Sequence, residues 1–292
     1  MTKTVLGIIG GSGVYDIGLD DSRWEKVKSP FGEPSDALLF GRLAGVDMVF
    51  LPRHGRGHVQ TPTSINYRAN IDAMKRAGCT DLISVSACGS FREDLPPGHF
   101  VLVDQFIDRT FSREKSFFGP GFVAHVSMAH PVCPGLVAAL DEAAREEAIP
   151  YTKGGTYLAM EGPQFSTLAE SKLYKAWGCH VIGMTGMPEA KLAREAELPY
   201  ALVAMVTDYD CWHPDHDHVT VEQVIRILFQ NADKARALVR RVAAKLGPVR
   251  KESPIGIERT LDTALITAPE KRDPELFKKL DAVAGRVLKL HH

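Results

Sequence analysis

Residues 181–212 constrain the fold most strongly, because they read as two buried strands joined by a short helix. The first apolar run breaks at Gly183-Met184-Thr185-Gly186, and Pro188 then opens a helix. The second apolar run ends at Thr207-Asp208-Tyr209-Asp210. In open α/β sheets, ligands bind where the carboxyl ends of the strands meet. The segment therefore predicts an α/β fold with a ligand site that includes Thr185, Asp208 and Asp210.

Asp208 and Asp210 lie two residues apart, directly after a strand that we expect to be buried. Two carboxylates in such a place are costly unless they hold a ligand, a proton or a partner. Crowding also raises the pKa of one of the two, which suits a group that donates a proton. We therefore take this pair as the candidate acid of a catalytic site.

The remainder of the chain repeats the order strand, loop, helix through one continuous unit, without an internal repeat. Two capping boxes, Thr167–Glu170 and Thr220–Gln223, mark the starts of helices. Residues 109–128 lack a clear period and predict a long surface loop. Further strands are expected at 5–9, 37–40, 46–51, 81–87, 100–106 and 155–160, and further helices at 66–77, 136–148 and 221–246.

No linker or change of composition divides the chain before about residue 247. We expect one α/β domain over residues 1–247. Residues 248–292 would form a C-terminal extension with an amphipathic helix at 275–290, packed on the domain or on a neighbouring subunit. The final Leu290-His291-His292 is compatible with a truncated tag.

Charge and cysteine content narrow the environment and the partners. The formal net charge of −1 over 292 residues gives no electrostatic reason to expect nucleic acid or an anionic membrane as a partner. No apolar run approaches the ~20 residues that span a bilayer. The five cysteines are scattered and lack CxxC spacing, which is typical of a reduced cytoplasmic protein.

Four expected strand ends carry groups that bind anions. They supply Ser12 within Gly10-Gly11-Ser12-Gly13, Arg53 with His54, Ser86 and Thr185. Hydroxyls, and an Arg that can donate two parallel hydrogen bonds, are suitable ligands for phosphate. Taken singly, each segment is compatible with a simple turn or a solvated basic loop, and neither a P-loop nor a GxGxxG fingerprint is present. Together they indicate a phosphate site, with the apolar Met184 placed to contact a sugar.

Eleven motifs, in this order, carry a resemblance to a known family. They are GIIGGSG (7–13), SPFG (29–32), PSDALLFG (34–41), RHGR (53–56), NYRANIDAMK (66–75), SACGSFRED (86–94), DQFIDRT (104–110), MAHPVCP (128–134), EGPQFST (161–167), MTGMPEA (184–190) and VTDYDCW (206–212). This set resembles the purine nucleoside phosphorylase superfamily over residues 5–246. The resemblance implies a single α/β domain with a central, mixed, partly barrel-like sheet flanked by helices. It also implies a homotrimer, or a dimer of trimers, with active sites at subunit interfaces.

The family resemblance assigns roles to individual residues. Phosphate contacts would fall on Ser12, Arg53, His54, Ser86, Ala87 and Thr185. Substrate contacts would fall on Met184 (ribose), Phe165 (purine), Val221 and Val224 (5′ group), Asp208 and Asp210 (base), and His125 of a neighbouring subunit. Inorganic phosphate would be the co-substrate, with no cofactor and no metal.

The implied reaction is phosphorolysis of 5′-methylthioadenosine to adenine and 5-methylthioribose 1-phosphate. Asp208 would protonate N7 of the leaving adenine, and Asp210 would be its partner. An aspartate at 208 favours 6-aminopurines, since family members that act on 6-oxopurines carry Asn at the matching position. Two valines suit a 5′-thioether better than a hydroxyl, although adenosine or methylthioinosine stays an alternative substrate.

Two alternatives come from other functional classes. His213-Pro214-Asp215-His216-Asp217-His218 contains metal-ligand types, which would suit a metal-dependent hydrolase, although the spacing fits no helical pair of ligands. A non-catalytic nucleoside-binding module would keep the base pocket but would not need the phosphate ligands. The intact phosphate set argues against the second alternative. Glu161 is either a ligand-binding carboxylate or a partner for a nearby loop.

Overall fold

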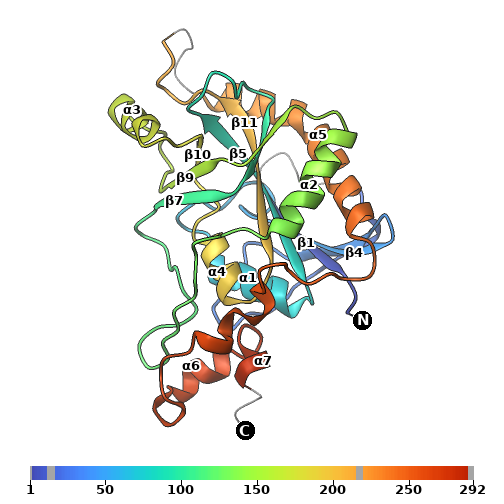
Figure 1. Ribbon diagram of the computed structural model, residues 1–292, viewed down its shortest axis with the longest axis vertical. Helices are drawn as coiled ribbons and strands as arrows, with labels where there is room; N and C mark the ends of the chain where they lie inside the picture. Colours follow the sequence, from blue (N-terminus) through green and yellow to red (C-terminus); the bar gives the residue numbers. More distant parts are fainter. Residues whose placement is uncertain (1, 12–16, 215–219, 289–292) are drawn as a thin grey trace.

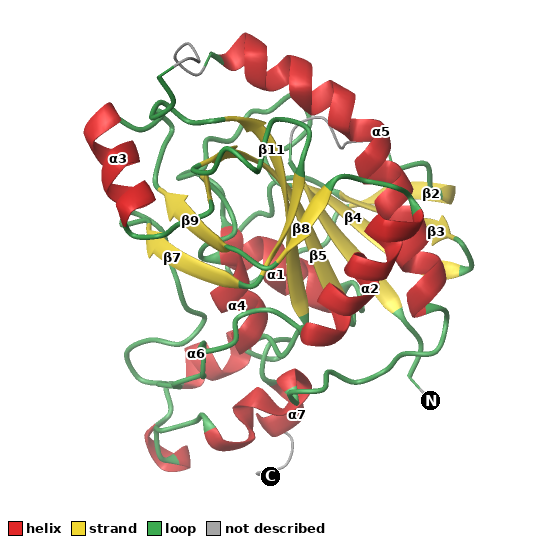
Figure 2. Ribbon diagram, turned by 45° about the horizontal axis from the view of Figure 1, so that its top comes forward, coloured by secondary structure: helices red, strands yellow, loops and turns green. Residues whose placement is uncertain are grey.

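The computed structural model describes residues 2–11, 17–214 and 220–288. A mixed sheet of 11 strands forms the centre of this described part, and helices flank the sheet (Figures 1 and 2). The strands are β1 (Val5–Gly10), β2 (Asp20–Glu25), β3 (Leu38–Leu43), β4 (Val46–Pro52), β5 (Asp81–Ser90), β6 (Phe100–Val103), β7 (Gln105–Arg109), β8 (Tyr151–Lys153), β9 (Thr156–Met160), β10 (Val181–Gly183) and β11 (Tyr200–Asp208). The helices are α1 (Tyr67–Arg76), α2 (Pro134–Glu146), α3 (Leu168–Ala176), α4 (Glu189–Glu195), α5 (Val221–Leu246), α6 (Pro274–Lys279) and α7 (Gly285–Leu288).

The sheet branches at β5. Its main order is β2-β3-β4-β1-β5-β10-β9-β7, and β11 pairs with both β5 and β6. Residues 81–85 of β5 pair in parallel with β1, whereas Gly89 and Ser90 pair antiparallel with β10. The mixed α/β architecture is as expected. The sheet does not close into a barrel, and the branch at β5 is its only departure from a simple strand order among the described strands.

Alternation along the central strands divides the core between the two faces of the sheet. In β11, Ala201, Val203 and Met205 face a core shared with α2 and α5. The intervening Leu202 and Ala204 face the core that contains α1 and α4. All of β11 up to Thr207 is buried, as a strand covered by helices on both faces requires. Packing of helices on both faces of the sheet holds the carboxyl ends of the strands in place, and the site lies at these ends.

The strand and helix bounds correct several expectations. β5 continues through Ser86 to Ser90 instead of ending in a loop, because its last residues pair with β10. The expected strand 100–106 divides at Asp104 into β6 and β7, which pair with different strands. The expected helix 275–290 is two short helices, α6 and α7. β2 and β8 were not expected; β2 is fully exposed and β8 has only 3 residues.

The segment 109–128 is a loop, but it is not confined to the surface as expected. Phe117 and Phe122 in this loop are fully buried, and Arg113 is nearly so. Glu195 of α4 accepts hydrogen bonds from Ser116 Oγ and from the backbone N–H of Phe117, both at 2.7 Å. The loop is therefore anchored to the core at several points.

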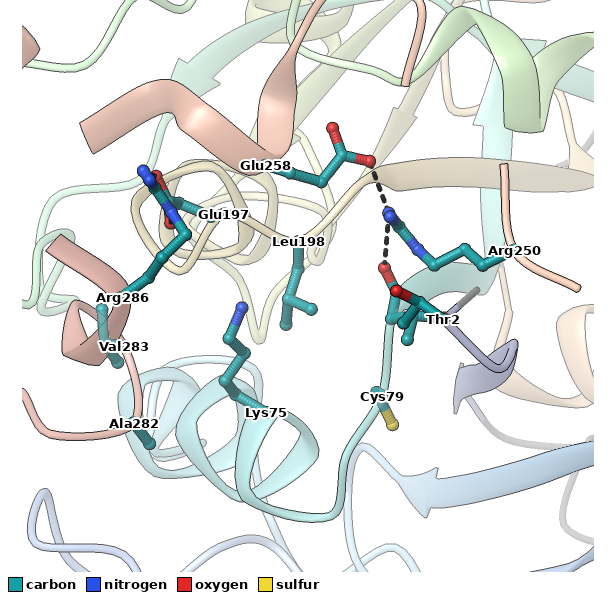
Figure 3. Close-up of a pocket in the computed structure, with 11 residues that line it drawn as sticks. Thr2, Lys75, Cys79, Glu197, Leu198, Arg250, Glu258, Ala282, Val283 and Arg286 are labelled. Atoms are coloured by element: carbon teal, nitrogen blue, oxygen red, sulfur yellow. Dashed lines mark hydrogen bonds and ion pairs between the residues drawn. The ribbon is translucent and has the colours of Figure 1, made fainter. Parts of the chain in front are cut away.

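Residues 248–288 pack against the rest of the chain. Leu261, Val283 and Val287 join the same hydrophobic core as α1 and α4. A small cavity of about 200 Å³ lies at this junction, and Lys75, Arg250, Glu197 and Glu258 line it (Figure 3). The domain division at residue 247 stays a prediction. Within the described ranges, no helix is both long enough and apolar enough to cross a bilayer.

Candidate active site

A cavity of about 760 Å³ opens where β1, β4 and β10 end. Gly11 and Arg53 directly follow β1 and β4, Thr185 is the second residue after β10, and Ser86 of β5 lines the same cavity. The other residues that line it are His54, Gly57, His58, Pro62, Ala87, Pro163, Phe165, Met184, Val221, Val224, Ile225, Leu228, Phe229, Ala232 and Arg236. The fold thus brings together residues from six separate parts of the chain.

A smaller cavity of about 100 Å³ adjoins the first. Phe165, Met184 and Val224 line both cavities, so the two form one continuous site. Asp208 and Asp210 line the smaller cavity, together with Cys88, Gly89, Met160, Ile182, Gly183 and Thr207. The site therefore has an anion-binding end and an acidic end, with apolar side chains between them.

Arg53 is fully buried, and the protein itself uses most of its hydrogen-bond donors. Its Nε donates to Glu189 Oε2 at 2.9 Å, and its Nη2 donates to the Ile9 carbonyl and to Ser84 Oγ. Nη1 donates to the Val85 carbonyl at 3.2 Å, which leaves one N–H of this group. Arg53 can therefore offer phosphate one N–H of Nη1, and not the two parallel hydrogen bonds expected from the sequence.

Gly11 allows the backbone to approach this remaining donor. A Cβ at position 11 would lie 3.2 Å from Arg53 Nη1. The glycine after β1 therefore keeps the space beside the guanidinium open. Ser12, the next predicted phosphate ligand, lies outside the described residues.

His54 is held in one tautomer. Its Nδ1 lies 2.9 Å from the Gln60 carbonyl, which can only accept, so Nδ1 carries the proton. Burial and the neighbouring Arg53 charge lower the pKa of His54 to about 4. The ring is therefore neutral at pH 7, and Nε2 can accept a hydrogen bond from a protonated phosphate oxygen.

The hydroxyls of Ser86 and Thr185 meet across the cavity wall at 2.7 Å. Both residues are buried, and Ala87 beside them is half-buried. Because Ser86 belongs to β5 and Thr185 follows β10, the two strands place a pair of hydroxyls at one point. Such a pair can direct its donors at one anion.

Asp208 and Asp210 form a directly linked pair at the end of β11. The backbone N–H of Asp210 donates to Asp208 Oδ1 at 2.8 Å, and Thr207 Oγ1 donates to Asp208 Oδ2 at 2.7 Å. Burial raises the pKa of Asp208 to about 6, and the charge of Asp210 raises it as well. The two hydrogen bonds act in the opposite direction and lower the pKa. Burial raises the pKa of Asp210 as well.

Asp210 has a buried carboxylate at the acidic end of the site. Asp210 is only 6% exposed, and its Oδ2 has no hydrogen-bond partner in the described part of the chain. Asp208 is closely packed too, because a Cβ on Gly89 would lie 2.8 Å from its Oδ1. A buried carboxylate oxygen without a partner is costly, and a ligand that donates to it removes that cost.

The remaining predicted contacts divide into two groups. Phe165 and Met184 lie between the two cavities, and Val221 and Val224 begin α5 along the larger one. Val221 is 62% exposed. His125 is exposed, and its backbone N–H donates to the Ala264 carbonyl. It lines neither cavity of its own chain. Its contribution to a neighbouring subunit stays a prediction.

Glu161 belongs to a loop anchor and not to the ligand cavity. Its Oε2 accepts from the N–H groups of Phe111 and Ser112, and its Oε1 accepts from Thr63 Oγ1 and Arg113 Nε. Of the two interpretations, partner for a nearby loop is therefore the one observed. Sequence reasoning missed Arg113 altogether, and missed Glu189 as the partner of Arg53; Arg113 stands among polar and charged residues at 112–116, so the local sequence carries no signal of its burial.

Most of the candidate metal-ligand segment His213–His218 lies outside the described residues. In the described ranges, three or more His, Cys, Asp or Glu residues do not gather in a metal-binding arrangement. Asp215, His216, Asp217 and His218 lie outside those ranges.

The branched mixed sheet, with its cavity at the strand ends, defines a nucleoside phosphorylase fold. A family model described as the phosphorylase superfamily matches residues 5–244, and the chain belongs to this family. A protein of Rhodospirillum rubrum named S-methyl-5′-thioadenosine phosphorylase is 67% identical over 287 residues, covering 98% of each chain. This similarity includes the C-terminal extension, which the motifs did not cover.

Solved structures agree with these relatives. A methylthioadenosine phosphorylase from an antarctic soil metagenomic library is 44% identical, with a TM-score of 0.90 over 97% of this chain and 99% of that one. A variant of the adenosine/methylthioadenosine phosphorylase of Schistosoma mansoni, in complex with methylthioadenosine, is 39% identical. Its TM-score is 0.82 over 88% of this chain and 96% of that one.

Proposed function

We propose that this chain catalyses the phosphorolysis of S-methyl-5′-thioadenosine to adenine and 5-methylthioribose 1-phosphate. The observation that carries the proposal is the buried Asp208–Asp210 pair, which lines a small cavity continuous with the anion-binding one. The relatives that share the fold over nearly the full chain are named for this activity. Phosphate is the co-substrate, and the reaction needs no further cofactor.

Phosphate occupies the end of the cavity bounded by Arg53, His54, Ser86, Ala87 and Thr185, with Ser12 as a further ligand. In the reaction, the bond from the anomeric carbon to N9 of adenine breaks, and a phosphate oxygen forms a new bond to that carbon. The sugar carries positive charge in the transition state, and the bound anion stabilises that charge.

Asp208 donates its proton to N7 of the leaving adenine, so that the base departs as a neutral molecule. Its raised pKa keeps the proton available closer to neutral pH than for an ordinary aspartate. Asp210, which lines the smaller cavity, accepts from the 6-amino group. Phe165 stacks on the purine, Met184 contacts the ribose, and Val221 with Val224 receives the methylthio group.

The active form is a homotrimer, or a dimer of trimers, in which His125 of one subunit contacts the substrate of the next. Support comes from the position of His125 outside the cavities of its own chain. The apolar Val221, Ile225 and Phe229 of α5 are also exposed in the single chain. The five cysteines are free thiols, as suits the cytoplasm.

The direct test is adenine release from S-methyl-5′-thioadenosine, measured by ultraviolet absorbance in matched samples with and without phosphate. The proposal expects release only with phosphate. Equal release of adenine without phosphate would identify a hydrolase. No release in either sample would support the non-catalytic nucleoside-binding module instead. A parallel sample in chelator separates the metal-dependent alternative, because a phosphorylase without a metal keeps its full rate.

A further inference from the structure

Arg113, in the loop between β7 and α2, is one of the most completely bonded side chains in the described structure. Its side chain is 1% exposed. Nη1 donates to the carbonyls of Met184 and Met187, both at 2.8 Å, and to Tyr67 Oη at 3.1 Å. Nη2 donates to the Glu161 carbonyl at 2.7 Å and to the Met160 carbonyl at 3.3 Å. Nε donates to Glu161 Oε1 at 3.3 Å.

These acceptors belong to the two segments that form the middle of the site. Met160 and Glu161 end β9, a few residues before Phe165. Met184 and Met187 belong to the segment that follows β10. β9 and β10 are parallel neighbours, and their last paired residues are Ala159 and Gly183. Beyond that pair the ladder stops, and the Arg113 guanidinium joins the two segments, together with a hydrogen bond of 3.4 Å from the Thr185 N–H to Tyr157 Oη.

The two segments approach one another closely at the point that Arg113 fixes. A Cβ on Gly162 would lie 2.4 Å from Met184 Sδ. A small change in the separation of the segments would therefore move Met184 relative to Phe165. These two side chains line both cavities, and in the proposed function Met184 contacts the ribose and Phe165 stacks on the purine.

We propose that Arg113 is a positioning residue that sets the distance between the Met184 and Phe165 walls and thereby the placement of the nucleoside. The inference rests on the proposed function. All five N–H groups of its guanidinium have acceptors in the protein, so Arg113 acts through the two segments and not on the substrate. Glu161 holds the guanidinium from its other side, through Nε.

The phosphate end also has supports outside the two segments that Arg113 holds, and this predicts a split in the kinetics. Thr185 lies between Met184 and Met187, but its hydroxyl also meets Ser86 of β5, and Arg53 is held by Glu189. Loosening the Arg113 clamp should therefore affect the nucleoside more than phosphate. A loss of folded protein alone would instead lower kcat and leave both KM values unchanged.

The test compares Arg113→Lys with wild type, measuring kcat and both KM values. Lysine keeps the charge but has three donors on one atom and cannot span the two segments. A displacement of about 1 Å in a reacting site costs roughly 10²-fold, so kcat/KM for the nucleoside should fall by about that factor. The KM for phosphate should change by less than about threefold, since Arg53, His54 and Ser86 lie outside the segments that Arg113 holds.

Arg250→Lys is the matched control. Arg250 is a half-buried arginine whose side chain is 8% exposed, and it donates to the Thr80 carbonyl, to Asp81 and to Glu258. It lies at the cavity shown in Figure 3, which shares no lining residue with the active site. It should lower thermal stability and leave both KM values unchanged. A second arm adds methylguanidinium to Arg113→Ala and to Arg250→Ala, and only the first should regain activity.

Glu161→Gln keeps the test decisive if the Arg113 variants do not fold, because it removes a charged partner of the clamp and keeps the guanidinium. It should raise the nucleoside KM with little change in the phosphate KM. The inference is overturned if the soluble variants show unchanged nucleoside kinetics, or equal changes in both KM values. An inactive wild type would instead refute the proposed function.

Discussion

The backbone N–H of Asp210 donates a hydrogen bond to Oδ1 of Asp208 over 2.8 Å. This bond holds the first carboxylate, while the buried Oδ2 of the second has no hydrogen-bond partner in the described structure. The two residues thus present different chemistry to one small cavity. Asp208 has the environment of an acid, and Asp210 that of an acceptor.

Replacing Asp208 with alanine removes the proposed proton donor. General acid catalysis is typically worth about 10²- to 10⁴-fold, and kcat for methylthioadenosine should fall by at least that range. Steady-state adenine release measures the effect, with circular dichroism to verify the fold. A nearly unimpaired variant would refute the role of Asp208.

Replacing Asp208 with asparagine should change the preference for the base. Wild type should discriminate against 5′-methylthioinosine by about 10⁴-fold relative to methylthioadenosine, because a 6-oxo group mismatches the buried carboxylates. The asparagine variant can donate to a 6-oxo group and should reduce that ratio by at least roughly tenfold. Comparing kcat/KM for the two nucleosides, which share one sugar, tests this; equal rates in wild type would contradict it.

The raised pKa of Asp208 makes stability depend on pH in a defined direction. Its folded pKa is about 6 against an ordinary 3.8, so the folded state holds the proton more tightly. The resulting stabilisation is fully present below about pH 3.8 and is lost as the pH rises through about 6, a change of about 2–3 kcal/mol. Asp208→Asn lacks this loss, so its stability relative to wild type should increase between pH 4 and pH 7.

Urea denaturation at several pH values and one protein concentration measures this difference. Asp94→Asn is the control, because the hydrogen bond from Arg92 lowers the pKa of Asp94. Its pH dependence should have the opposite sign. A constant difference between Asp208→Asn and wild type over this range would show that Asp208 does not titrate as proposed.

Glu189 should matter for stability as the partner of Arg53. Both side chains are almost fully buried, and Tyr200 Oη also donates to Glu189, at 2.8 Å. Glu189→Ala leaves a buried, unpaired guanidinium and should reduce the free energy of unfolding by about 3–5 kcal/mol. Glu275→Ala, which breaks an exposed pair with Lys278, should cost less than about 1 kcal/mol. Similar losses for the two variants in urea titrations would contradict this account.

The parts of the site predicted from sequence are those that strand ends present locally. Asp208 and Asp210 adjoin in the chain, and Arg53 and Thr185 directly follow apolar runs, so their places at the carboxyl edge follow from the strand pattern. The branch at β5 could not be foreseen, because Gly89 and Ser90 continue as strand only through pairing with β10. The division at Asp104 likewise depends on which strands β6 and β7 meet.

The supporting residues escaped prediction because their partners are distant in sequence. Arg53 meets Glu189 across 136 positions, and Arg113 meets Met184 across 71. Local pattern treats Arg113 as a charged residue in a long loop. Only the folded chain shows that this loop carries a buried guanidinium between two parts of the site.

The reaction itself is tested most directly by ³¹P NMR of wild-type protein with methylthioadenosine and inorganic phosphate. The account predicts that the phosphate signal is lost as a sugar 1-phosphate ester signal grows, with one ester formed for each adenine released. Release of adenine with all phosphate remaining inorganic would contradict the account and show that water, not phosphate, attacks the sugar.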